Sequence, residues 1–155
     1  MKHHIKRIAI VFLGLALLLL MCTLFLISPF AQLYSKTGFL ASPFVTQLYA
    51  YDAVGEGHDY DGLKIFLLLR PDQIHFTFFA LNHPEWALLP CDETILNSEI
   101  CNVEYNPQMQ DMLNVEHGFW YYKEQLTGGQ LFIYDVDSGK IYLRMANCFV
   151  TTDSK

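Results

Sequence analysis

The chain has few charged residues, and one long stretch near its start has none. Asp, Glu, Lys and Arg make up 17% of the residues and hydrophobic residues 52%, which is apolar for an average soluble domain. Residues 8–30, "IAIVFLGLALLLLMCTLFLISPF", hold no charge at all. As a helix they would extend about 34 Å, enough to cross a hydrocarbon core of about 30 Å. This run therefore predicts a transmembrane anchor.

Basic residues are scarce beyond this run. Lys2, Lys6 and Arg7 precede it, whereas only seven basic residues and all sixteen acidic ones follow it, a formal charge of −9. Because positive flanks of a first apolar helix stay in the cytoplasm, residues 1–7 are expected to be a cytoplasmic basic tail. The rest is expected to be periplasmic or otherwise extracytoplasmic, on a single-pass protein of the cytoplasmic (inner) membrane. The acidic balance argues against nucleic acid as a partner and disfavours anionic lipid headgroups.

Two other fates of the apolar run stay open. A cleaved secretory signal needs small residues before the cut, and here Pro29 or Phe30 occupies such positions. A lipid-modified cysteine needs a small residue before it, and Met21 precedes Cys22. The uncleaved anchor is the favoured interpretation, with its outer end at Ser28 and Pro29 because proline interrupts the helical hydrogen bonds.

Residues 31–62 form a membrane-proximal segment, predicted as a short helix or extended piece that packs on the domain or the bilayer. The loop "GEGHDYDG" closes it. Next, "LKIFLLLR" and "IHFTFFAL" alternate apolar and other residues around "PDQ". This period of two predicts a β-hairpin of two central strands, covered on both faces.

A long connection follows, in which Pro84 and Pro90 prevent regular strand pairing, and it contains one short helix, "NPQMQDMLN". Asn106 is its expected N-cap and Pro107 its first residue, with Met109, Met112 and Leu113 on one side. "FWYYKEQ", "QLFIYDV" and "KIYLRMANCFV" then predict three strands of a meander. Residues 63–155 are thus expected to form an exported β-rich domain. The fold class is α+β: a single transmembrane helix, then a small, mainly antiparallel sheet of about five strands with one or two short helices.

Cysteine is also scarce, with three residues outside the apolar run. Cys91 and Cys101 would close an eleven-residue loop, worth roughly 3 kcal/mol to an exported domain. This pairing is the favoured disulfide, although a bridge to Cys148 or three reduced thiols remain alternatives. No CxxC or HxxxH spacing is present, so no zinc site, metal or cofactor is predicted.

Motifs of common enzymes are missing. The chain has no G-x-S-x-G and no glycine-rich phosphate loop, so a non-enzyme without catalytic residues is expected. A hydrolytic or metal site can be drawn only from His58, Asp59, Asp61 and His117, residues that loops would have to bring together. The D-x-D-x-G of "YDVDSGK" resembles part of a calcium loop, but a hairpin turn explains it without an ion.

Aromatic residues are abundant instead. Two stretches supply the predicted protein-binding patch: Trp86, Phe119, Trp120, Tyr121 and Tyr122. Rings of this kind, surrounded by acidic residues, favour a basic protein partner, although they can equally fill a core. The predicted function is a membrane-anchored, non-catalytic protein-binding module, one version being a toxin-immunity or inhibitor protein. An accessory subunit of a membrane complex and an envelope hydrolase are the alternatives; the oligomeric state is left open.

Overall fold

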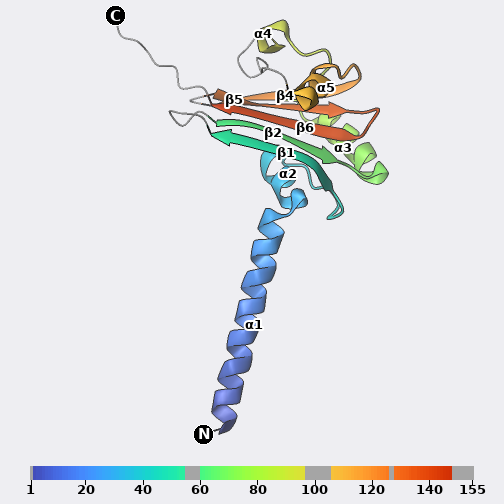
Figure 1. The fold of residues 1–155 in the computed structure, drawn as a ribbon. Helices are drawn as coiled ribbons and strands as arrows, with labels where there is room; N and C mark the ends of the chain where they lie inside the picture. The colour runs from blue at the N-terminus through green and yellow to red at the C-terminus, as the bar shows by residue number, and fades with distance from the viewer. Residues whose placement is uncertain (1, 55–59, 97–105, 126–127, 148–155) are drawn as a thin grey trace, which may run out of the picture.

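The computed structural model describes residues 2–54, 60–96, 106–125 and 128–147, and the side chains of residues 11–53, 61–96, 106–125 and 128–146. A long helix, α1 (Lys2–Ile27), projects from a globular part built on one six-stranded sheet (Figure 1). The strands are β1 (Thr46–Val54), β2 (Tyr60–Leu67), β3 (Ala87–Leu88), β4 (Gly118–Gln125), β5 (Gly128–Asp135) and β6 (Lys140–Asn147). All neighbours pair antiparallel, in the order β1-β2-β6-β5-β4-β3.

The junction between α1 and α2 (Pro29–Thr37) follows local sequence rules. The Ser28 hydroxyl accepts from the Ala31 N–H at 3.2 Å, with Pro29 at the first helical position, an arrangement that begins helices. Gly38 ends α2 in the left-handed conformation, at φ 75°, as glycine does most easily. The predicted break at Ser28 and Pro29 is confirmed.

Among the helices whose side chains are described, none is both long and apolar enough to cross a membrane alone. The consecutive pair Val11–Ile27 and Pro29–Thr37, bent by 59°, has the length and composition for it when taken together.

The predicted hairpin between residues 63–70 and 74–81 is wrong. Residues predicted as a strand at 74–81 belong to α3 (Arg70–Asn82). The run "FTFFAL" is apolar at nearly every position, so it satisfies the periods of a strand and of a helix alike. Pro71 and Asp72 in the first turn favour a helix, and residues four apart, Phe76 and Ala80, enter the core.

The strand β1 takes the place of that hairpin partner. It pairs with β2 from Thr46 against Leu67 to Val54 against Tyr60, with an irregularity at Gln47–Tyr49. The sheet therefore has six strands rather than about five, and residues 46–54 of the predicted membrane-proximal segment are one of them. The meander of β4, β5 and β6 agrees with the prediction, as does the general class of helices with an antiparallel sheet.

Helix α5 (Pro107–Leu113) begins as predicted. The Asn106 side chain accepts from the Gln108 N–H at 3.0 Å, Pro107 is the first helical residue, and Met109 and Met112 are buried. The remaining helix, α4 (Glu93–Leu96), is a single turn in the connection from β3.

Each face of the sheet has its own hydrophobic core. We call the face covered by α2, residues 38–45 and α3 the proximal face, and the face covered by α4 and α5 the distal face. Leu33, Phe39 and Phe76 pack on the proximal face, whereas Met109 and Met112 pack on the distal face. Because α1 continues into α2, it leaves the globular part on the proximal side, away from α4 and α5 (Figure 1).

Candidate functional site

The aromatic residues predicted to bind a protein are divided between the two cores. Side chains on one strand alternate between faces. Trp86, Phe119 and Tyr121 accordingly join the proximal core, and Trp120 and Tyr122 pack against the distal core. The structure therefore brings them together as two groups, one on each side of the sheet.

The proximal group is mostly enclosed. Trp86 and Phe119 are only 6% and 5% exposed, and the Trp86 ring meets Phe76 edge-on at 5.1 Å between centroids. Contact of a partner with these two rings would require the core to open. Trp120 and Tyr122 are half-buried, and the Trp120 indole donates to the Leu88 carbonyl at 3.1 Å.

Exposed acidic side chains mark the distal face. Asp92 and Glu93 lie at the start of α4 and Asp111 lies on α5, all three exposed. The Asp92 carboxylate accepts from the Thr94 N–H and hydroxyl, both at 2.9 Å, and these bonds lower its pKa. A carboxylate held ionised in this way keeps its negative charge at mildly acidic pH.

The two helices of the proximal side carry the opposite charge. Residues 28–51 contain no acidic residue, and the one acidic residue of α3, Asp72, is buried. The exposed charges of α2 and α3 are Lys36 and Arg70. Exposed carboxylates also lie outside these helices, at Asp52 on β1 and Glu85 after α3. The contrast in charge is therefore between the helices that cover the two faces.

A small cavity lies where α1, α2 and the sheet meet. It has a volume of about 260 Å³. Its lining residues are Leu26, Ile27, Gln32, Ser35, Lys36, Lys64, Phe66, Leu143 and Met145. The Lys64 ammonium donates to the Gln32 amide oxygen at 3.4 Å and lies 3.9 Å from an Asp52 carboxylate oxygen. These contacts fix α2 against β1 and β2.

A buried arginine crosses between two strands on the distal face. Arg144 on β6 is 3% exposed and forms an ion pair with Asp61 on β2. Its guanidinium also donates to the carbonyls of Gly62, at 3.2 Å, and Met145, at 2.9 Å. These contacts explain how a charge is tolerated inside an apolar strand. Sequence reasoning did not single out Arg144, although a charge between the apolar residues Leu143 and Met145 was the available signal.

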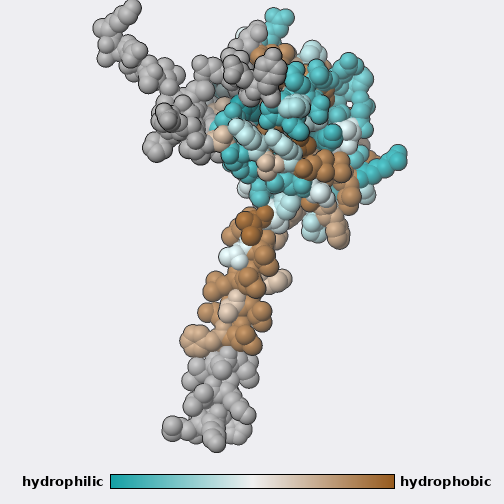
Figure 2. Space-filling model, viewed as in Figure 1, coloured by the Kyte–Doolittle hydropathy of each residue, from teal (hydrophilic) through white to brown (hydrophobic). Residues whose placement is uncertain are grey.

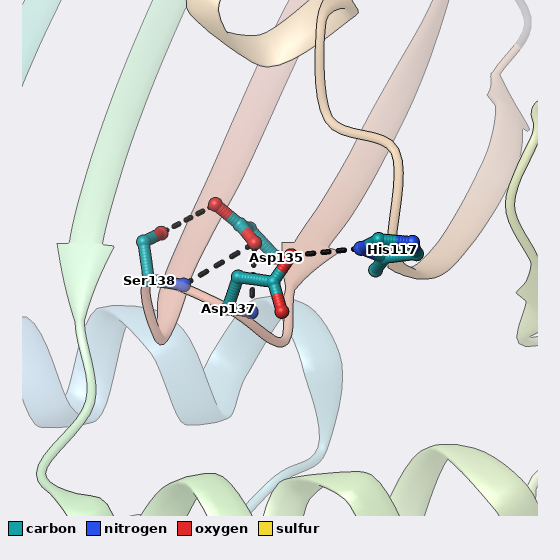
Figure 3. A network of polar contacts seen from close by, with 4 residues as sticks. All are labelled: His117, Asp135, Asp137 and Ser138. Carbon is teal, nitrogen blue, oxygen red and sulfur yellow. Dashed lines mark hydrogen bonds and ion pairs between the residues drawn. The ribbon is translucent and has the colours of Figure 1, made fainter.

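The turn between β5 and β6 is held by its own polar groups (Figure 3). The Asp135 carboxylate accepts from the Asp137 N–H at 2.9 Å, from the Ser138 N–H at 3.3 Å and from the Ser138 hydroxyl. Gly139, at φ 71°, completes the turn. The predicted hairpin turn in "YDVDSGK" is confirmed, and the Asp135 carboxylate is engaged with the backbone.

His117 joins this turn from the start of β4. Its Nδ1 lies 2.8 Å from the Asp137 carboxylate, and this contact raises the pKa of the imidazole. The Ser138 hydroxyl donates to Asp135 and not to His117, and the two residues lie on opposite sides of the aspartates (Figure 3). No nucleophile is therefore positioned by His117 in this cluster.

The other members of the predicted hydrolytic or metal site are not brought to His117. Asp61 is bonded to Arg144, and His58 and Asp59 lie outside the described residues. In the part of the chain that the structure describes, no three His, Cys, Asp or Glu side chains are placed to hold a metal ion. Cys91 is buried in the distal core, whereas Cys101 and Cys148 lie outside the described residues; the Cys91–Cys101 disulfide stays a prediction.

The chain was compared with protein-family models, with curated proteins and with solved structures, and none of the three comparisons finds a match.

Proposed function

We propose that this protein is a non-catalytic binding module, held outside the cytoplasm by its N-terminal helix, that presents its distal face to a basic region of another protein. The observation that carries the proposal is the contrast in exposed charge between the helices that cover the two faces of the sheet. The exposed carboxylates of Asp92, Glu93 and Asp111 belong to α4 and α5 and the residue before α4, on the side that points away from α1 (Figure 1). A surface of one sign steers a partner of the opposite sign and aligns it on approach.

The half-buried aromatic residues of the distal side support the same choice. Trp120 and Tyr122 pack against the distal core and keep part of their rings exposed. Large rings that are held rigidly and partly exposed commonly supply much of the energy of a protein interface. Of the five aromatic residues predicted from the sequence, these two belong to the proposed surface.

A tether suits a module of this kind. Residues 11–27 are apolar and exposed along α1, from Val11 at 68% to Ile27 at 64%, and in the proposal lipid covers them. Confinement to a membrane surface raises the effective concentration of the module for partners that arrive there. An immunity or inhibitor protein that meets an incoming toxin is one version of this function.

The test is capture of a partner from envelope extracts by the full-length protein in detergent. We expect Glu93→Lys together with Asp111→Lys to reduce capture strongly, since both carboxylates are exposed on the distal face. Glu85→Lys is the matched control because it reverses an exposed charge outside α4 and α5. Capture that equals that of an anchor-only fusion of residues 1–37 would overturn the proposal.

A further inference from the structure

Helix α3 carries an apolar stripe on the side turned away from the sheet. Ile74, Phe78 and Leu81 are 55%, 61% and 61% exposed. Their spacing of four and three places them on one face of the helix. The opposite face, at Phe76 and Ala80, is buried in the proximal core. The sequence stretch that was predicted as a strand is thus a helix that is apolar on both sides.

The segment 38–45 packs against α3 and has exposed apolar side chains of its own. Its Ser42 backbone N–H and hydroxyl donate to the Asp72 carboxylate at 3.0 and 2.6 Å, and the ring of Phe39 meets that of Phe76 at 4.8 Å. This packing leaves Leu40 and Phe44 exposed, at 69% and 71%. The five exposed side chains, which we call the proximal stripe, are Leu40, Phe44, Ile74, Phe78 and Leu81.

The proximal stripe lies on the side from which α1 leaves. In Figure 2, apolar surface gathers at the lower right of the globular part, whereas the upper right is mostly hydrophilic. Apolar surface of this kind on one side of a domain marks an interaction site.

We infer that the proximal stripe rests in the headgroup and upper acyl region of the same bilayer that α1 enters, so that the globular part lies on the membrane. The inference rests on the proposed membrane anchor. Two features favour lipid over a protein on this side. The exposed charges of α2 and α3, Lys36 and Arg70, are positive and suit lipid phosphates. Tyr34 on α2, 51% exposed, is of a type that prefers the membrane interface.

A shallow contact of this kind does not bury an acidic side chain of the two helices. The only acidic side chain of α3 is buried and bonded to Ser42, so no described carboxylate of α2 or α3 must leave water. Amphipathic surface helices insert their apolar face by about 5–10 Å. A seated domain would hold α4, α5 and the distal face toward solvent, which leaves that face open to a partner.

The experiment measures tryptophan quenching by bromine-labelled acyl chains, with full-length protein reconstituted into phosphatidylcholine vesicles. Phe78→Trp places a reporter on the proximal stripe, and Gln110→Trp places one at an exposed position of α5. The unsubstituted protein supplies the background from Trp86 and Trp120. We expect the added emission at position 78 to be quenched and that at position 110 to be unaffected. Ile74→Trp repeats the measurement should Phe78→Trp disturb folding.

Equal quenching at positions 78 and 110 would overturn the inference. Alkaline carbonate extraction of the same vesicles separates this failure from failure of the anchor. Protein that resists extraction without quenching at position 78 leaves the anchor standing and removes only the seated domain. Release of the protein by carbonate would contradict both the membrane anchor and the seated domain. A second copy of the chain would cover the stripe instead if two results were found together. The protein would be a dimer in detergent that Phe78→Ser dissociates, and the reporter in Phe78→Trp would not be quenched.

Discussion

The carboxylate of Asp72 accepts two hydrogen bonds from Ser42, one from its N–H at 3.0 Å and one from its hydroxyl at 2.6 Å. Asp72 lies in the first turn of α3, and Ser42 lies thirty residues earlier in the segment that precedes β1. This pair joins the segment 38–45 to α3, the two segments that carry the proximal stripe.

Removing the Asp72 carboxylate should loosen that connection. We expect Asp72→Ala to lower the free energy of unfolding by about 1–3 kcal/mol, because the partly buried Ser42 N–H loses its acceptor. The double variant with Ser42→Ala should cost less than the sum of the two single changes. Thermal or urea unfolding followed by near-ultraviolet circular dichroism measures this. Asp111→Ala, exposed on α5, is the control and should change stability by less than about 0.5 kcal/mol; equal effects would contradict the assignment.

The two partners of the buried ion pair should respond differently. Asp61→Ala leaves the Arg144 charge 3% exposed without its carboxylate, at a cost of about 2–3 kcal/mol given that Asp61 is itself partly open to solvent. Arg144→Met removes the charge and keeps an apolar side chain of similar length, so it should cost less. Equilibrium unfolding of both variants compares them. A larger loss for Arg144→Met would mean that the bonds to Gly62 and Met145 dominate.

The pH dependence of His117 follows from its contact with Asp137. The hydrogen bond and the nearby negative charge raise the pKa of His117 above 6.5. A histidine with a raised pKa stabilises the folded state fully below its unfolded pKa, and this contribution fades as the pH rises through the folded value. In NMR titration, Asp137→Asn should lower the pKa of His117. Ser138→Ala should leave it nearly unchanged, since Ser138 bonds to Asp135; an equal shift in both variants would refute the pairing.

The predicted Cys91–Cys101 disulfide can be tested directly. We expect protein isolated from an oxidising compartment to resist alkylation at both positions until it is reduced, and Cys91→Ser to lose roughly 3 kcal/mol of stability. Peptide mass spectrometry after differential alkylation identifies the pair. Cys22→Ser, exposed on α1, should leave the pattern of the other thiols unchanged. A bridge that includes Cys148 would replace the predicted pairing.

Exchange of the apolar helix distinguishes a binding module from a subunit that uses helix contacts. Gly14 faces open space on α1, and small residues allow helices to approach closely in membranes. If residues 8–30 serve only as a tether, an unrelated span should preserve capture of the partner by the distal face. Loss of capture in the exchanged protein, with the globular part still folded, would favour the accessory-subunit alternative.

Much of the local structure was determined by the sequence itself. The break at Ser28 and Pro29, the start of α5 at Asn106 and the β5–β6 turn depend on side chains within four residues of the backbone groups they satisfy. Such short-range bonds can be recognised from residue type and spacing. The strands of the meander could also be predicted from the sequence, because apolar and polar residues alternate along them.

Only the tertiary structure decided the remaining features. Residues 74–81 suit a helix and a strand equally, and packing of Phe76 and Ala80 against the sheet selects the helix. The pairing of Arg144 with Asp61 joins residues 83 positions apart. The division of the five aromatic residues between the two faces depends on which strand and which helices form each face. Contacts between distant segments depend on the arrangement of the whole chain, which a local pattern cannot encode.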